Sequence, residues 1–141
     1  MRTFHSIVGL VAALVVLTLA APAFSHHAFN AEFDANRHVV FTGTVTKMMW
    51  VNPHAWIYVD VKKSDGTTEE WMVEAGTPNT LLRRGFTKAS LQAGTVIKVD
   101  GYQSKDGSLR ANGRDLTLPD GRTLFLGNAE GGAEGAPGAK K

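Results

Sequence analysis

Apolar residues alternate with polar ones from His38 onward, and this two-residue period constrains the fold more than any other feature of the chain. One face of the segment carries Val39, Phe41, Gly43 and Val45. Alternation of this kind, rich in β-branched residues, predicts a half-buried strand. Lys47 interrupts the apolar face, so we expect a β-bulge before Met48-Met49-Trp50.

The same period recurs along the chain between turn signals. Asn52-Pro53, Ser64-Asp65-Gly66 and Lys105-Asp106-Gly107 are typical turn sequences. Further strands are expected at about residues 55–62, 67–75, 95–103 and 109–118. Residues 122–126 are expected to add a last short hairpin arm.

A short helix is expected between the third and fourth strands. Thr77 is a good N-cap, Pro78 suits the first helical position, and Gly85 is a good stop. The element order predicts an all-β fold with one short helix, a small five-stranded antiparallel OB-fold-like barrel. The predicted core consists of Val39, Phe41, Val45, Ile57, Val59, Val61, Trp71, Val73, Ile97 and Val99.

The amino terminus has the layout of a secretory signal peptide over residues 1–25. Arg2 precedes an apolar run from Ile7 to Ala21, which is shorter than the roughly 20 residues of a bilayer span. Small residues allow a cut after Ala23 or after Ser25, and the sequence leaves both open. The alternative is a retained amino-terminal anchor. We expect a periplasmic or secreted protein without stable membrane insertion after cleavage.

Three regions are expected after the signal peptide. Residues 26–37 are polar and predict an arm, and residues 38–128 predict one OB-like domain. Residues 129–141 are rich in Gly and Ala without apolar periodicity, so a disordered tail is expected. The chain has no Cys, which excludes disulfides and thiolate chemistry. The formal net charge of +2 gives no sign of a nucleic-acid partner.

Several motifs bear a family resemblance. They are His26-His27-Ala28-Phe29, Thr42-Gly43-Thr44-Val45, Trp50-Val51-Asn52-Pro53-His54-Ala55-Trp56 and Leu118-Pro119-Asp120-Gly121. Together they resemble a family of small exported bacterial proteins of unknown function. The resemblance covers nearly all of the chain after the signal peptide. It implies an exported OB-like domain that starts at the His pair, and it implies no activity. Ala28 stands where the family leads us to expect a small hydroxyl residue.

The mature amino terminus is a candidate metal site. A cut after Ser25 exposes the α-amine of His26, which can chelate a metal with its imidazole, and His27 adds another imidazole. A cut after Ala23 gives Phe24-Ser25-His26, the arrangement of copper-chelating tripeptides. Nitrogen-rich tetragonal sites favour Cu(II). The alternative is a solvated polar arm whose copper affinity is incidental.

His54 is a second candidate metal ligand. It lies in the loop between the first two expected strands, where OB-folds contact ligands. It completes a site with the terminus only if the arm folds back, and the sequence gives no direct sign of this. The alternative, which the sequence favours, is a loop histidine that caps a backbone group or faces water. His38 is expected on the surface.

A candidate ligand face is expected opposite the core. Trp56 and Tyr58 alternate with Ile57 and Val59, and Arg110 and Arg114 alternate on the last long strand. Such a face suits an envelope protein or a small anionic ligand, and the alternative is that both aromatics belong to a second small core. The carboxylates Asp60, Glu69, Glu70 and Glu74 are expected to be solvated.

No motif for a catalytic nucleophile, a phosphate loop or a zinc hydrolase occurs. The sequence therefore favours an exported, non-enzymatic binding or accessory module that requires no cofactor and has a Cu(II)-capable amino terminus at its His pair. The alternative is an envelope interaction module that uses the barrel face.

Overall fold

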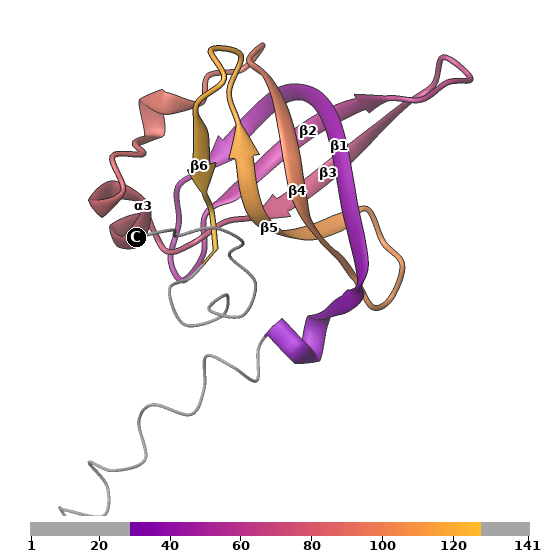
Figure 1. Ribbon diagram of the computed structural model, residues 1–141, viewed down its shortest axis with the longest axis horizontal. Helices are drawn as coiled ribbons and strands as arrows, with labels where there is room; N and C mark the ends of the chain where they lie inside the picture. The colour runs from indigo at the N-terminus through magenta and orange to yellow at the C-terminus, as the bar shows by residue number, and fades with distance from the viewer. Residues whose placement is uncertain (1–28, 128–141) are drawn as a thin grey trace, which may run out of the picture.

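The computed structural model describes residues 29–127, which form a mostly antiparallel β domain with short helices (Figure 1). The strands are β1 Phe33–Met49, β2 Trp56–Lys62, β3 Thr68–Glu74, β4 Val96–Ser104, β5 Arg110–Thr117 and β6 Thr123–Phe125. Helices α3 Pro78–Arg83 and η1 Lys88–Ser90 lie between β3 and β4. The predicted signal peptide, His26, His27 and the predicted tail at 129–141 lie outside the described residues.

The strands are hydrogen-bonded in the order β3-β2-β1-β4-β5-β6, and these neighbours are antiparallel. An additional parallel pairing joins β3 to β5, with Val73 opposite Ala111. Each of the strands β1 to β5 therefore has a neighbour on both sides along part of its length. Pairing of this kind satisfies backbone groups that an open sheet would leave at its edges.

The predicted number of five strands is wrong, because the sheet has six. Residues 122–126 were expected as a hairpin arm, and within them β6 pairs with β5, placing Leu124 opposite Leu116. Leu126 is fully buried and Leu124 packs against the core. The arm joins the sheet because these two leucines bury apolar surface there.

Strand β1 begins at Phe33, five positions before the alternation that starts at His38. Phe33 is buried and lies opposite Ser104 of β4, with a register shift before His38. The residues between them are polar, so this part of the strand shows no apolar alternation from which it could be predicted. The expected bulge is confirmed, because the β1–β2 register shifts between Val45 and Lys47.

Helix α3 follows the predicted signals closely. The Thr77 hydroxyl accepts a hydrogen bond from the Thr80 amide at 3.2 Å, and Pro78 occupies the first turn. Gly85 has a φ of +77°, the left-handed conformation that glycine tolerates best. Leu81 is the helix's main contribution to the core, together with Phe86 just beyond it. Within residues 29–127, no helix is long and apolar enough to cross a membrane.

The core agrees with most of the predicted inward positions. The predicted residues found buried are Val45, Ile57, Val59, Trp71, Val73, Ile97 and Val99. Phe41 and Val61 are partly buried and pack against this core. The prediction is wrong for Val39, which is only half-buried because it lies on the part of β1 that pairs with β4 alone.

We predict that Val59→Asp unfolds the domain. Val59 has no exposed surface, and an unpaired carboxylate there would cost several kcal/mol, roughly the stability of a small domain. Thermal melting followed by circular dichroism checks this, with Val96→Asp as the matched control because Val96 is 50% exposed. A cooperative melt of Val59→Asp near the wild-type temperature would contradict the assignment of strand faces.

Candidate functional site

His54 lies beside the end of β3 because the residue after it is locked to that strand. Ala55 is fully buried, its amide donates to the Gly76 carbonyl at 3.2 Å, and its carbonyl accepts from the Ala75 amide at 2.8 Å. These bonds fix the loop backbone next to Glu74. The His54 Nδ1 atom lies 2.6 Å from the Glu74 Oε1 atom, which we call the His54–Glu74 pair.

Glu74 is buried, with 7% of its surface exposed, and the prediction that it is solvated is wrong. It does point away from the main core, but neighbouring side chains cover it. Burial raises the pKa of Glu74 to about 7, the Glu32 carboxylate raises it further, and Arg110 opposes the change. The pKa of His54 is lowered by burial, and the Glu32 charge partly offsets this.

The two atoms of the His54–Glu74 pair lie within hydrogen-bonding distance. Their separation of 2.6 Å is at the short end of the range for N–H···O bonds. Burial shifts the pKa of each group in the direction of its uncharged form. Glu74 thus holds the imidazole at its Nδ1 atom.

Strand register extends this site into a face on the side of the sheet opposite the core, which we call the outer face. Directly opposed residues share a face, so two rows run across β1, β2, β3 and β5. The rows are Lys47, Tyr58, Met72 and Arg110, and Met49, Trp56, Glu74 and Asn112.

The outer face is held by contacts between its own side chains. The Tyr58 hydroxyl donates to the Met49 sulfur at 3.4 Å, and the Lys47 Nζ atom lies 4.7 Å from the Tyr58 ring centroid. The Arg110 Cζ atom lies 5.5 Å from the Trp56 ring centroid. Trp56 and Tyr58 are both half-buried, so they are neither a fully enclosed second core nor bare surface.

Arg114 has other partners than the rest of the predicted ligand face. Its Nη2 atom lies 3.1 Å from Asp100, and its Nε atom lies 2.9 Å from Asp115. His38 also contacts Asp100, with its Nε2 atom 3.0 Å away, and is exposed as predicted. The structure therefore brings Trp56 and Arg110 together and directs Arg114 to a charge network on β4 and β5.

His26 and His27 lie outside the described residues, so the structure places only His54 of the three predicted metal ligands. Among residues 29–127, no group of three His, Cys, Asp or Glu side chains could hold a metal ion. A metal at His54 would therefore need ligands from outside these described residues.

Two functional candidates were missed by sequence reasoning. Glu74 was assigned to a solvated face, although its register opposite Trp56 and its position near His54 were implied by the expected β2–β3 hairpin. Glu32 was assigned to a polar arm, and it forms an ion pair with Arg110 at 2.7 Å. No local sequence pattern indicates the contact between Glu32 and Arg110.

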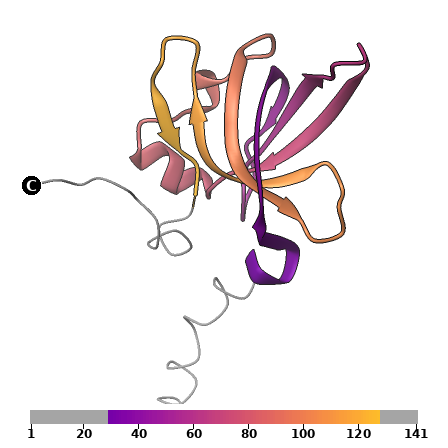
Figure 2. The same cartoon turned by 45° about the vertical axis from the view of Figure 1, so that its right-hand side comes forward.

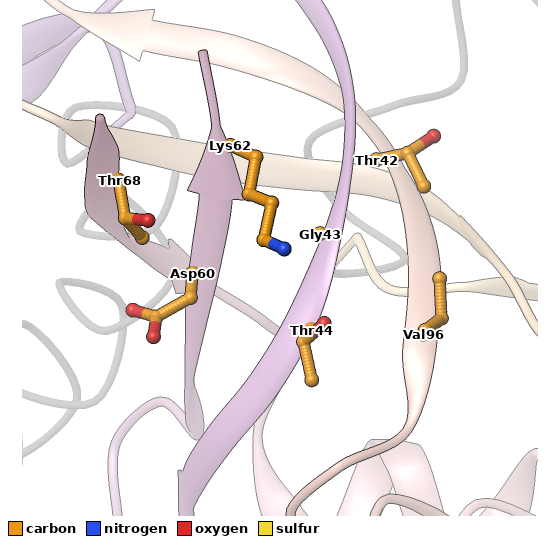
Figure 3. A pocket seen from close by; sticks show the side chains of 7 residues that line it. All are labelled: Thr42, Gly43, Thr44, Asp60, Lys62, Thr68 and Val96. Atoms are coloured by element: carbon orange, nitrogen blue, oxygen red, sulfur yellow. The ribbon is translucent and has the colours of Figure 1, made fainter. Parts of the chain in front are cut away.

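A separate shallow pocket of about 440 Å³ lies at the opposite end of β2 from His54 (Figure 3). It is lined by Thr42, Gly43, Thr44, Asp60, Lys62, Thr68 and Val96. The Lys62 side chain extends from β2 toward the gap beside β1. The pocket is lined by threonine and charged side chains, with Gly43 and Val96, and it shares no residue with the His54–Glu74 pair.

Comparison with known proteins identifies a family whose function is unknown. A family model described as a family of unknown function, DUF6152, matches residues 13–113, so the chain belongs to that family. No curated protein and no solved structure matches the chain.

We predict a pH-dependent stability difference between the wild type and Glu74→Gln. Because the pKa of Glu74 is raised from 4.5 to about 7, the stabilisation by its protonated form is complete below about pH 4.5. It is lost as pH rises through about 7, and amounts to at most about 3 kcal/mol. Denaturant unfolding at pH 4.5, 6 and 8 should show a steeper loss in the wild type than in Glu74→Gln.

The exposed residue Glu70 lies on the same strand, so Glu70→Gln is the control and should keep the wild-type pH dependence. Equal pH dependence in the wild type and Glu74→Gln would show that Glu74 is not buried as described.

Proposed function

We propose that this member of DUF6152 is an exported, non-enzymatic binding or accessory module that binds Cu(II). In this proposal the signal peptide at residues 1–25 is removed and the mature protein is periplasmic or secreted. The ligands are the new amino terminus with His26 and His27, joined by His54. No further cofactor is required.

The observation that carries the proposal is the His54–Glu74 pair. Metal-binding histidines usually donate their second ring N–H to a carboxylate, which sets the tautomer and orients the ring. Glu74 is buried and lies 2.6 Å from Nδ1, which is the geometry of such a supporting carboxylate. A purely structural histidine on a loop would not require a buried acidic partner whose pKa is raised to about 7.

The ligand chemistry favours copper. The terminal α-amine, the imidazoles and a deprotonated backbone amide form a nitrogen-rich set, and Cu(II) is the strongest binder of such sets among common divalent metals. With a cut after Ser25 the chelate starts at His26. With a cut after Ala23 it is Phe24-Ser25-His26, so either cut gives a copper-binding terminus.

The length of the chain allows the terminus to reach His54. Glu32 lies close enough to His54 and Glu74 for its charge to raise the pKa of both. His27 precedes Glu32 by five positions, which span at most about 17 Å when extended. Glu32 therefore lies near His54, which supports a shared site over an independent terminal chelator.

We also infer that the sheet is an OB-fold-like barrel. The circuit of pairings through β1, β2, β3, β5 and β4, with α3 between β3 and β4, supports this assignment. OB-folds bind ligands with the face of β2 and β3 and with the loop between β1 and β2. His54 lies in that loop, and Trp56 and Glu74 lie on that face.

We predict that His54→Ala lowers the Cu(II) affinity of the mature protein by about tenfold or more, because one imidazole ligand is lost. Copper should also raise the melting temperature of the wild type, because only the folded chain brings His54 to the terminus. Cu(II) titration against a competing chelator measures the affinity, and the intact mass of protein purified from the periplasm gives the cut site.

His38→Ala is the matched control, because His38 is exposed and lies in the separate network with Asp100. Unchanged affinity in His54→Ala and an unchanged wild-type melting temperature with copper would leave only an independent terminal chelator. A wild-type affinity no tighter than that of a free peptide of the same terminal sequence would remove the functional role altogether.

A second candidate function is an interaction module that uses the outer face. Trp56 and Tyr58 are half-buried rather than enclosed, and Arg110 adds a cation beside Trp56. Half-exposed aromatic side chains next to Arg are common at binding surfaces. The partner would be an envelope protein or a small anionic ligand.

We predict for this second candidate that Trp56→Ala abolishes capture of its partner from an envelope extract, because a central aromatic residue dominates such interfaces. The control is Val96→Ser, an exposed position on β4. A partner captured equally by the wild type and Trp56→Ala would exclude the outer face as its binding surface.

A further inference from the structure

Strands β1 and β2 separate beyond the pair formed by Thr44 and Asp60, and we call the gap between them the fork. Before Thr44, β1 pairs with β4 alone, and after Asp60, β2 pairs with β3 alone within the described chain. Figures 1 and 2 show the β2–β3 hairpin projecting past the edge of β1. The shallow pocket beside Lys62 lies in this fork and is lined by residues of both strands.

The edge of β1 that faces the fork carries backbone groups without a strand partner. The Val45 amide donates to the Thr95 carbonyl at 2.8 Å, and its carbonyl accepts from the Gly94 amide at 2.8 Å, so Val45 bonds toward the start of β4. Backbone groups of successive residues in a strand point to alternate sides. Thr42 and Val40 therefore direct their N–H and C=O groups away from β4 and into the fork. Within the described chain, no strand pairs with them on that side.

The end of β2 contributes a matching free edge. The Lys63 amide donates to the Thr67 carbonyl at 2.8 Å, so Lys63 bonds across the hairpin and its neighbour Lys62 faces the fork. Lys62 is exposed, and its side chain extends toward β1 (Figure 3). At the closed end, a Cβ atom on Gly43 would lie 2.5 Å from the Asp60 carbonyl oxygen. Glycine at this position therefore lets the two strands meet before they diverge.

The free edge of β1 lacks the features that protect exposed strand edges. Such edges usually carry Lys or Pro, or are interrupted by a bulge. Residues 39–46 contain no charged residue and no proline. The register shifts of β1 lie before His38 and after Val45, outside the fork, and Val40 is 49% exposed. This part of β1 is therefore a template on which an extended peptide can add a strand.

The surroundings of the fork define the chemistry of such a peptide. On one side of the sheet, Lys98 lies opposite Thr42, and Lys62 borders the fork from β2. Neither lysine forms an ion pair within the part of the chain that the structure describes. On the core side, Phe41 and Val61 are only partly buried. Because side chains alternate between the two faces of a strand, an added segment would meet lysines on one face and apolar surface on the other.

We propose that the fork binds an extended peptide segment in which carboxylate side chains alternate with apolar ones. Its backbone pairs with Val40 and Thr42, and its carboxylates lie beside Lys62, at the open end away from Asp60. A second copy of this chain matches the site poorly, because residues 39–46 offer no carboxylate to Lys62. The fork shares no residue with the proposed Cu(II) site or with the two rows of the outer face, so it is independent of both.

The first test is hydrogen exchange of single amides, measured by nuclear magnetic resonance in the mature protein. The probe is a blocked seven-residue peptide of alternating Glu and Val. Strand addition should slow exchange of the Val40 and Thr42 amides at least about tenfold. The Phe41 and Gly43 amides point toward β4, so they should change little and serve as internal controls. The same peptide with Lys in place of Glu is the matched probe and should bind at least about tenfold more weakly.

Two substitutions separate the backbone contact from the charge. Thr42→Pro removes the N–H that faces the fork, which an edge strand tolerates, and should weaken peptide binding at least about tenfold. Lys62→Glu should weaken binding about threefold to tenfold, as expected for reversal of one exposed charge. Lys88→Glu is its matched control, because Lys88 is an exposed lysine of η1 outside the fork. Thermal melting shows whether each variant folds, and Lys62→Glu keeps the test decisive if Thr42→Pro does not fold.

Alternation of the protected amides is the deciding observation. Slower exchange without alternation along β1, or exchange that millimolar peptide leaves unchanged, would overturn strand addition. Equal binding of the Glu and Lys peptides, or wild-type affinity in Lys62→Glu, would overturn the acidic chemistry of the segment. A dimer in sedimentation that Thr42→Pro abolishes, with no effect of the peptide, would assign the edge to a second copy instead. None of these readouts involves Cu(II), so failure of the Cu(II) proposal leaves them unaffected.

Discussion

The parallel pairing of β3 with β5 is the constraint on which the candidate site depends. Without it β5 would be held only through β4 and β6, and Arg110 would have no reason to lie beside β3. Pairing Met72 with Arg110 and Glu74 with Asn112 puts residues some 40 positions apart in sequence onto one face. The start of β5 then meets the start of β2, and the guanidinium of Arg110 reaches the Trp56 ring. The pairing of β3 with β5 that closes the sheet thus also brings the residues of the site together.

Burial of Glu74 is the unusual energetic feature of this face. A carboxylate taken from water resists ionisation, which is why its pKa rises to about 7, and the nearby Glu32 charge increases that resistance. The guanidinium of Arg110 offsets part of this penalty. An apolar residue at this position would avoid the penalty entirely. The arrangement is therefore better explained by a task for the imidazole than by the stability of the fold.

Local sequence signals predicted the local structure well. The candidate site depends on contacts between residues far apart in the sequence, which local signals do not contain. The alternation around Val45 predicted β1, Lys47 predicted its bulge, and Thr77 with Gly85 predicted α3, because each of these is decided by neighbouring residues. The two-residue alternation of β3 also placed Glu74 correctly on the face opposite the core. Its burial depends on Trp56 and on the loop at His54, and these contacts arise only after β2 and β3 pair. The anchoring of Glu32 depends on Lys105 and Arg110, more than 70 positions away, so no pattern within the arm could indicate it.

The absence of cysteine limits the metal chemistry that this face can support. Without thiolates, the soft ligands left on the outer face are Met49 and Met72, and the sulfur of Met49 already accepts a hydrogen bond from Tyr58. The remaining donors near His54 are nitrogen and carboxylate oxygen, which suit Cu(II) better than Cu(I). Glu74 is occupied by the His54 Nδ1 atom and Glu32 by Arg110, so both carboxylates act on charge and orientation. A metal bound here would therefore need nitrogen ligands from outside the described residues.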